Sequence, residues 1–242
     1  MTSGTMRIGA DVGGTFTDVV LETGERMFST KVLTDYDAPE DSVLDGVRTV
    51  VAEAGANLSG LETFIHGTTL ATNALIGRTG ARTALVTTEG FRDTIEMRTE
   101  SRFEQYDLNL VLPTPLVERR DRHTLGERVG ADGRVLRPFD DDEARTLIER
   151  LADRPDGHRY QAVAVGFIHS YVNGDHERRF RDLLLERMPD LAVSISSEVS
   201  PQMREFERFN TVCANAYVQP LMATYLRNLE ERLHAAGATC PV

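Results

Sequence analysis

The chain of 242 residues has only two cysteines, Cys213 in a predicted helix and Cys240 near the end. Two cysteines cannot form a disulfide framework, and their placement matches neither a Cys-x-x-Cys motif nor a zinc-binding pattern. The sequence therefore lacks the marks of a disulfide-stabilised secreted domain. We expect an intracellular, reducing compartment.

Long apolar runs are absent as well. No run approaches the roughly 20 residues that span a bilayer, and Met1–Arg7 lacks the charged region, apolar core and cleavage site of a signal peptide. Because 40% of the residues are hydrophobic, the chain can bury one substantial core, or a core and a smaller subdomain. We expect a cytoplasmic, globular enzyme that binds no membrane.

Basic residues are in the minority, with 27 against 38 acidic residues and a net charge of −11. A nucleic-acid surface requires a positive stripe, so this balance argues against nucleic-acid partners. Lys31 is the only lysine in the sequence. We attribute the bias toward arginine to genome composition and assign it no mechanistic meaning.

The first part of the chain predicts three strands and a helix. Apolar runs at Arg7–Val12 and Phe16–Leu21 flank Gly13 and Gly14, which indicates a hairpin, and Met27–Val32 is a third strand. Helical spacing of valine and leucine follows over Asp37–Ala54, with Asp37 as a possible N-cap and Gly55 as the end.

Strands and helices then alternate, which indicates an α/β fold. We expect strands at Thr63–His66, Arg82–Val86, Ala162–Val165 and Leu191–Ile195, and helices at Ala71–Ile76, Asp141–Leu151 and His176–Met188. Residues 99–138, with a hairpin turn at Asp132-Gly133, read as an inserted subdomain or a long excursion. Two amphipathic helices that meet at Pro220 end the chain.

The strongest chemical signal is the segment Asp11–Asp18, which reads Asp-Val-Gly-Gly-Thr-Phe-Thr-Asp across the first hairpin. Gly13 and Gly14 let the backbone approach a phosphate closely, and Thr15 and Thr17 add hydroxyl donors. Asp11 is placed to hold the water shell of Mg²⁺, and Asp18 can do the same or orient a nucleophile. The bland alternative is an ordinary glycine hairpin, for which one glycine usually suffices.

Two other phosphate motifs are excluded here. The Gly-Lys-Ser/Thr element of a Walker A loop is missing, and a strand rather than a helix follows the glycines, unlike the Rossmann fingerprint. The segment instead resembles the first phosphate motif of the actin and sugar-kinase superfamily. Its spelling is similar to the opening of hydantoinase A, 5-oxoprolinase and acetone carboxylase subunits.

A second block strengthens the resemblance to the hydantoinase A family. His66–Ala74 reads His-Gly-Thr-Thr-Leu-Ala-Thr-Asn-Ala, and Thr87–Asp93 reads Thr-Thr-Glu-Gly-Phe-Arg-Asp. The resemblance to the family continues at Ala162–Val165 and Ser196–Pro201 and ends at Asn215–Pro220, so it covers nearly the whole chain.

From the residues alone, the second block is a strand that runs into a helix N-terminus. Gly67 allows close approach, and Thr68 and Thr69 offer hydroxyls beside free N–H groups, which suits an anion or a polarised carbonyl. For Thr68 and Thr69 we favour function, because a cap needs one hydroxyl. For His66, a catalytic role and a core position remain equally open.

Several other charged residues have competing interpretations. Arg92 can stabilise transferred negative charge, or it can form a solvated ion pair with Asp93. Residues Glu198, Arg204, Glu205 and Arg208 fit a surface helix start better than a site. For His169, His176 and Glu177 we favour a solvated helix start over a metal site, and Cys213 is expected in the core.

The resemblance implies a fold and an activity. It implies an actin-like, ribonuclease H-like ATPase fold with a β-hairpin phosphate loop, an N-terminal domain over residues 5–200, and a truncated helical start of the next domain over 201–242. It implies ATP and Mg²⁺ as cofactors, phosphorylation of a small cyclic amide for ring-opening hydrolysis, and a hydantoinase B-type partner. An ATP-dependent ketone carboxylase subunit is the alternative within the family.

Two rival functions lie outside this family. One is a sugar or acetate-type kinase, or an ATPase that activates a dehydratase, and the other is a non-catalytic binding module. The sequence shows a single acidic-glycine hairpin, whereas the actin-like fold closes nucleotide between two related domains. We therefore expect the chain by itself to bind nucleotide weakly and to turn over little.

Overall fold

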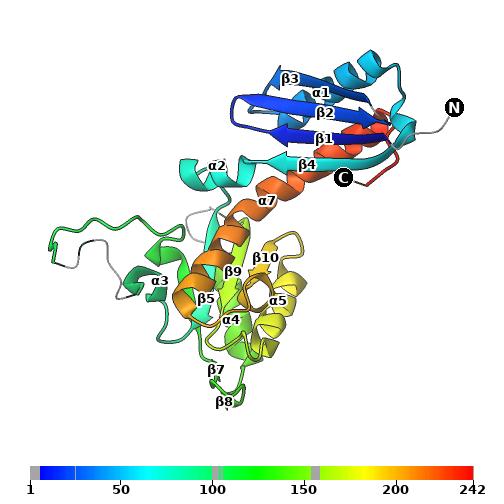
Figure 1. Ribbon diagram of the computed structural model, residues 1–242. Coiled ribbons are helices and arrows are strands. Elements are labelled where there is room, and N and C mark those ends of the chain that lie inside the picture. The colour runs from blue at the N-terminus through cyan, green and yellow to red at the C-terminus, as the bar shows by residue number, and fades with distance from the viewer. Residues whose placement is uncertain (1–5, 25, 100–103, 105, 154–158, 242) are drawn as a thin grey trace. The chain divides into compact units, whose positions relative to one another are not determined.

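The computed structural model describes residues 6–24, 26–99, 104, 106–153, 159–241 (Figure 1). It divides into two compact units. Unit 1 comprises Met1–Gly77 and Leu221–Val242, and unit 2 comprises Arg78–Pro220. The units thus divide the chain at other points than the predicted domain boundary after residue 200. In the described ranges, no helix is both long and apolar enough to cross a membrane.

Unit 1 is built on a four-stranded sheet of order β3-β2-β1-β4. The strands are β1 (Met6–Val12), β2 (Phe16–Thr23), β3 (Arg26–Leu33) and β4 (Leu61–Thr68). β1 and β2 form the predicted antiparallel hairpin, β3 continues it, and β4 lies parallel to β1. The predicted order of three strands, a helix and a fourth strand is confirmed.

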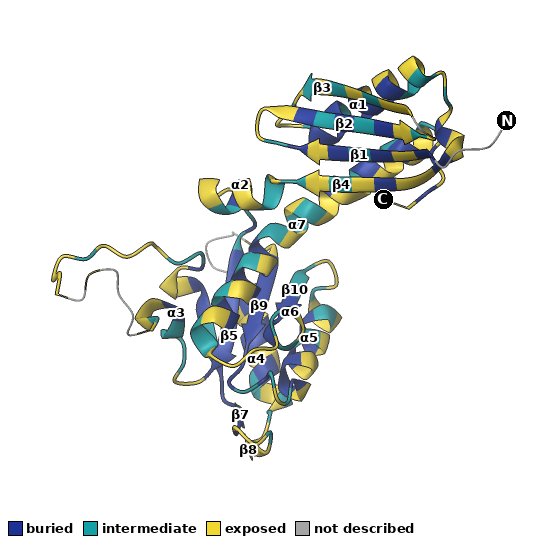
Figure 2. Cartoon of the chain, viewed as in Figure 1, coloured by how far each residue is buried: buried dark blue, intermediate teal, exposed yellow. Residues whose placement is uncertain are grey.

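Only one face of this sheet carries the core of unit 1. Buried residues alternate with intermediate or exposed ones along β1 and β2, as a period of two residues requires (Figure 2). The buried set packs with helix α1 (Pro39–Ala54) and with residues of helix α7 (Glu205–Ala235) after position 220. The other face presents exposed side chains that include Met27, Leu33 and Ile65.

Helix α1 ends as expected but begins differently. Gly55 adopts the left-handed conformation at φ 62°, which confirms it as the helix stop. The N-cap is Ala38, which gives no side-chain hydrogen bond, so the prediction of Asp37 is wrong. The Asp35 carboxylate instead accepts from the backbone N–H groups of Asp37 (2.9 Å) and Ala38 (3.3 Å), and this turn precedes Pro39.

Unit 2 contains a parallel four-stranded sheet of order β10-β9-β5-β6. Its strands are β5 (Thr83–Thr88), β6 (Arg122–Leu125), β9 (Ala162–Gly166) and β10 (Ala192–Ile195). Helices α4 (Asp141–Ala152) and α5 (Asp175–Arg187) contribute to one core cluster of this unit, and the first half of α7 contributes to another. Unit 2 also has two short helices, α3 (Thr94–Met97) and α6 (Ser196–Val199), and the 3-10 turn Arg119–Asp121. The short helix α2 (Leu70–Gly77) and the 3-10 turn Leu58–Gly60 belong to unit 1.

The expected excursion over 99–138 is more integrated than predicted. It supplies β6 to the main sheet, and only β7 (Arg128–Val129) and β8 (Val135–Arg137) form a separate two-stranded hairpin. Gly133 has a φ of 81°, so the Asp132-Gly133 turn is confirmed. Residues 100–103 and 105 lie outside the described residues.

Helix α7 corrects the prediction of two helices that meet at Pro220. One continuous helix runs through the proline. A proline removes one N–H donor and crowds the preceding turn, but apolar side chains before and after it, such as Cys213 and Leu229, are fully buried. We infer that this packing on both sides outweighs the local cost.

Candidate functional site

The candidate phosphate loop is the β1–β2 turn of unit 1. Val12 pairs with Thr17 at the end of the ladder, so Gly13, Gly14 and Thr15 form the connection. The Gly13 N–H donates to the Phe16 carbonyl at 3.0 Å, and the Thr34 N–H donates to the Thr15 carbonyl at 2.9 Å. Within the described part of the chain, the N–H groups of Gly14 and Thr15 have no acceptor.

The two glycines of the turn differ in why the fold accepts them. A Cβ added at Gly13 would lie 2.9 Å from the Phe16 carbonyl oxygen, which is too close for the hairpin as built. A Cβ added at Gly14 would meet only Asn73 Nδ2, at an ordinary contact distance of 3.8 Å. Neither residue has φ in the left-handed region. The hairpin therefore requires glycine at position 13 but gives no reason for glycine at position 14.

A row of polar groups crosses the exposed face of the sheet beside this turn. The strand register pairs Lys31 with Asp18, Asp18 with Asp11, and Asp11 with Gly67. Lys31 Nζ lies 2.7 Å from Asp18 Oδ2, with both side chains about half exposed. Asp11 is exposed and has no hydrogen bond or ion pair among the described residues. A Cβ on Gly67 would stand 3.2 Å from Asp11 Oδ1.

This row gives the structure a free carboxylate at the end of a strand. Two carboxylates directly opposite each other on neighbouring strands repel, and the Lys31 ammonium offsets that repulsion on the Asp18 side. Lys31 is the residue that sequence reasoning set aside. The available signal was the third strand predicted directly after the first hairpin, because its pairing with β2 places position 31 opposite position 18.

Thr17 lies on the opposite, buried face. Its side chain is 0% exposed, and its hydroxyl lies 3.0 Å from Thr34 Oγ1. Thr34 Oγ1 donates to the Gly13 carbonyl at 3.1 Å, so Thr17 is left to donate to Thr34. Thr17 supports the turn from beneath, whereas Thr15 is exposed beside Gly14.

The β4–α2 junction holds the second predicted block. Thr68 Oγ1 accepts from the Leu70 N–H at 3.1 Å, which caps the start of α2. The Thr69 N–H and hydroxyl both donate to the Val12 carbonyl, at 3.2 and 3.4 Å. Asn73 Nδ2 donates to Thr69 Oγ1 at 3.3 Å. Both threonine hydroxyls therefore have local partners that tie this junction to the end of β1.

His66 faces the core side of the sheet, away from Asp11. It pairs with buried Ala10 in the register, and its Nε2 lies 2.7 Å from the Tyr225 hydroxyl. Burial holds the pKa of His66 below its ordinary value, although the Ala10 carbonyl and the charge of Asp11 act in the opposite direction. His66 Nδ1 is buried without a hydrogen-bond partner among the described groups.

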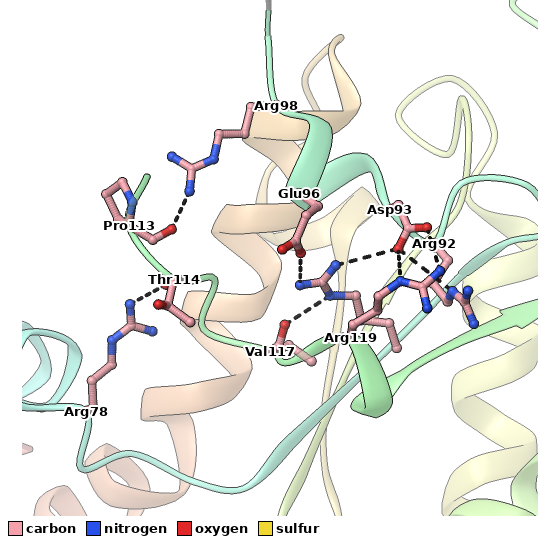
Figure 3. A network of polar contacts seen from close by, with 10 residues as sticks. Arg78, Arg92, Asp93, Glu96, Arg98, Pro113, Thr114, Val117 and Arg119 are labelled. Carbon is pink, nitrogen blue, oxygen red and sulfur yellow. Dashed lines mark hydrogen bonds and ion pairs between the residues drawn. The ribbon is translucent and has the colours of Figure 1, made fainter. Parts of the chain in front are cut away.

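Arg92 belongs to unit 2, where it follows the end of β5. Its Nε lies 3.9 Å from Asp93 Oδ1, while Arg119 takes both oxygens of Asp93 at 3.0 and 3.1 Å (Figure 3). Hydrogen bonds from Arg119 hold the pKa of Asp93 below its ordinary value. The buried Arg122 guanidinium joins this network at Asp93 Oδ1, 3.9 Å away, and also pairs with Glu96 at 2.6 Å. Structurally, Arg92 is thus the outer member of an arginine–aspartate network.

A buried polar network in unit 2 was missed by sequence reasoning. His176 is 9% exposed and Glu177 is 0% exposed, so the prediction of a solvated helix start is wrong for both. His176 Nδ1 lies 2.7 Å from buried Glu127, which also accepts from the Thr88 hydroxyl. Glu177 accepts from the N–H groups of Phe167 (2.8 Å) and Ser197 (2.7 Å) and from the Ser196 hydroxyl (2.7 Å).

Arg208 completes this network and was also expected at the surface. It is 0% exposed and donates to Ser196 Oγ and to the carbonyls of Gln202 and Phe167. Burial lowers its pKa. These groups follow the carboxyl ends of β5, β9 and β10. Polar residues after the strands of a predicted parallel sheet were the sequence signal for this network, because the carboxyl ends of such strands lie at one edge. They hold one another, and no cluster of three metal-ligating side chains occurs in the described ranges.

Comparison with known proteins agrees with this fold and with the motifs. The family model of the hydantoinase/oxoprolinase N-terminal region matches residues 7–188. The chain therefore belongs to the hydantoinase/oxoprolinase family, and the predicted resemblance is confirmed.

Relatives in this family include enzymes of known activity. The chain is 31% identical to the caprolactamase subunit alpha of Pseudomonas jessenii, over 97% of the chain and 34% of that subunit. It is 31% identical to the 5-oxoprolinase of Saccharomyces cerevisiae, over 99% of the chain and 21% of that protein. The chain thus spans about a third or less of these relatives.

Two solved structures share the fold. The crystal structure of the ATP-dependent caprolactamase from Pseudomonas jessenii matches with a TM-score of 0.86 and 30% identity, over 97% of the chain and 34% of that structure. The nucleotide-free acetone carboxylase matches with a TM-score of 0.85 at 23% identity, over 98% of the chain and 35% of that structure. The mixed α/β fold predicted from the sequence is therefore confirmed.

Proposed function

We propose that this chain is the N-terminal, phosphate-binding part of an ATP-dependent amidohydrolase that activates a small cyclic amide for ring opening. The observation that carries the proposal is Gly14. The hairpin does not require a glycine there, whereas a phosphate group approaching the free N–H groups of Gly14 and Thr15 does. Asp11, free and exposed beside the turn, supports the same assignment.

The residues present fit Mg²⁺ and ATP. Mg²⁺ prefers one or two carboxylates together with phosphate oxygens and water, and Asp11 is such a carboxylate. The Gly14 and Thr15 N–H groups and the Thr15 hydroxyl would bind phosphate oxygens. Lys31 would add the positive charge that an anionic ligand needs beside two aspartates. Gly67 leaves room beside Asp11 that a side chain would fill.

When bound, ATP would supply a phosphoryl group to the amide oxygen, which would make the amide carbon a better electrophile for water without a strong base at neutral pH. This chain's own residues would bind and orient the phosphates. Thr17 and Thr34 would fix the turn from the core side, and Thr68 and Thr69 would fix the β4–α2 junction. Asp18 is retained as a second acidic group beside the turn, whereas Arg92 belongs to unit 2 and has no part in this proposal for the loop of unit 1.

The fold supports an actin-like assignment in the same way. The resemblance implies a first phosphate loop on a β-hairpin, and the acidic-glycine segment lies at the turn of the β1–β2 hairpin. The named relatives act on a lactam and on 5-oxoproline, which favours cyclic amides as substrates. We propose a hydantoinase B-type partner, because the caprolactamase relative is one subunit of an assembly.

A ketone carboxylase subunit is the second candidate. The chain is also 32% identical to the acetophenone carboxylase gamma subunit of Aromatoleum aromaticum, over 95% of the chain and 33% of that subunit, and the phosphate loop would serve either reaction. ATP hydrolysis by the full-length subunit with its partner separates the two. Stimulation by 5-oxoproline or caprolactam supports the amidohydrolase, and stimulation by acetone with bicarbonate supports the carboxylase.

The phosphate site itself is tested by calorimetry with this chain. We expect Mg-ATP to bind weakly, with a millimolar dissociation constant or about −4 kcal/mol, and Asp11→Asn to abolish the Mg²⁺-dependent part. Asp45→Asn, a change on the exposed side of α1 at a carboxylate that pairs with Arg48, is the matched control. Wild-type binding by Asp11→Asn would remove this carboxylate from the site, and no binding by the wild-type chain would refute the proposal for this chain.

A further inference from the structure

The His66–Tyr225 pair joins two segments 159 residues apart in the sequence, within unit 1. The Tyr225 hydroxyl and His66 Nε2 lie 2.7 Å apart, and the two rings lie at a centroid distance of 5.4 Å. Phe64, two residues earlier on β4, also stacks on His66, with ring centroids 6.3 Å apart. Tyr225 is only 4% exposed. The imidazole is thus held by rings and by one hydrogen bond.

Both partners of this hydrogen bond are neutral at physiological pH. Burial lowers the pKa of His66 and raises the pKa of Tyr225. A neutral imidazole that accepts at Nε2 carries its proton on Nδ1. Nδ1 is buried and makes no hydrogen bond of normal geometry among the described residues, although the nearby Ala10 carbonyl acts to raise the pKa of the ring. The Tyr225 contact is therefore the one well-formed hydrogen bond that fixes the orientation of this ring.

The position of His66 in the chain connects the pair to the exposed face. The next residue, Gly67, is the one whose added Cβ would stand 3.2 Å from the Asp11 carboxylate. Thr68 and Thr69, which follow, cap α2 and bind the Val12 carbonyl at the start of the β1–β2 turn. A change in the course of β4 at His66 would move these groups relative to Asp11.

We propose that Tyr225 is a positioning residue, which fixes the Gly67–Thr69 backbone beside Asp11 through its hydrogen bond to His66. The pair touches no ligand and acts from the core side of the sheet. The consequence for nucleotide binding rests on the proposed function, whereas the positioning itself is a property of the ligand-free chain.

Hydrogen exchange of the ligand-free chain tests the positioning directly. In Tyr225→Phe, which keeps the ring and removes the hydroxyl, we expect the amides of residues 67–73 to exchange about 5- to 10-fold faster. Tyr217→Phe, a buried tyrosine of the same helix with no hydroxyl hydrogen bond among the described residues, should leave them unchanged. Unchanged exchange in Tyr225→Phe, or an equal rise along β2, would overturn the inference.

Substitutions of His66 distinguish positioning from simple packing. His66→Gln retains a hydrogen-bonding group near the place of Nε2 and should keep exchange at residues 67–73 near the wild-type rate, whereas His66→Leu should raise it as Tyr225→Phe does. Equal effects of Gln and Leu would overturn the role of the hydrogen bond.

Calorimetry separates this inference from the proposed function. We expect Tyr225→Phe to raise the dissociation constant for Mg-ATP about 5-fold at a temperature where the variant is fully folded, with Tyr217→Phe at the wild-type value. An unchanged constant in Tyr225→Phe would overturn the link to the site. If the wild-type chain binds no Mg-ATP, the proposed function fails, and the exchange experiment still decides whether Tyr225 positions residues 67–69.

Discussion

Gly14→Ala adds one methyl group to the β1–β2 turn at a point where the fold has room for it. The new Cβ would meet only Asn73 Nδ2 at 3.8 Å, and the backbone there is outside the left-handed region. Alanine at such a position stabilises a protein by about 0.4–1 kcal/mol, because it restricts the unfolded chain. For a chain of this size, we expect the Tm to stay level or rise by roughly 1–4 °C.

The same methyl group would occupy the space in which a phosphate approaches the turn. We therefore expect Gly14→Ala to weaken Mg-ATP binding at least about tenfold, or about 1.4 kcal/mol, while the fold gains stability. A variant that is more stable but binds the ligand more weakly indicates a glycine that serves ligand binding and not the fold.

Gly13→Ala is the matched comparison in the same turn. Its Cβ would stand 2.9 Å from the Phe16 carbonyl oxygen, so the hairpin must shift, at a cost of about 1–3 kcal/mol. Differential scanning calorimetry and titration calorimetry on both variants measure the two effects. The reasoning is refuted if Gly14→Ala binds Mg-ATP as the wild type does, or if it destabilises the chain as much as Gly13→Ala.

Three further outcomes are expected. Lys31→Met should lower the free energy of unfolding in urea by less than about 1 kcal/mol, because its ion pair with Asp18 is half exposed. It should nevertheless weaken Mg-ATP binding, and most strongly at low salt, with Lys31→Arg as the control; a loss of affinity that does not depend on salt would contradict the charge role. Because the pKa of His66 is lowered in the folded state, this histidine takes up a proton near pH 6.5 in the unfolded chain but only at lower pH in the folded chain. The free energy of unfolding should therefore fall as the pH is lowered from 7.5 to 5.5, and it should fall less steeply in His66→Gln; equal slopes in the two proteins would contradict this. Burial raises the pKa of Cys213 to about 12, so in a Cys240→Ser background a thiol reagent at pH 8 should label the chain only when it unfolds, and rapid labelling of the native chain would show an accessible thiol.

The strands and most helices could be predicted because their signals are local. The apolar runs of β1 and β2 and the Gly55 stop of α1 depend on residues a few positions apart. The proposed phosphate turn was found for the same reason. Its residues form one continuous segment of sequence.

What escaped prediction depends on contacts between distant segments. Lys31 joins the site through strand register, and Tyr225 reaches His66 from the other end of the chain. The burial of Glu177 and Arg208 follows from the packing of α5 and α7 against strand ends that no local pattern specifies. The helix through Pro220 has the same cause, since tertiary packing outweighed a local signal.

Unit 1 draws its core from two segments that are separated in the sequence by unit 2, and this affects the order in which the two units can fold during synthesis. The sheet face of β1 and β2 is covered in part by Tyr225, Leu229 and Leu233, which leave the ribosome after unit 2. Unit 2, residues 78–220, is complete before them. Domains generally fold from the N-terminus onward. Here unit 2 can fold first, because the apolar face of the hairpin with the proposed phosphate loop stays partly uncovered until the end of α7 has been synthesised. The first part of the chain to fold is therefore unit 2, which contains none of the residues of the proposed phosphate loop.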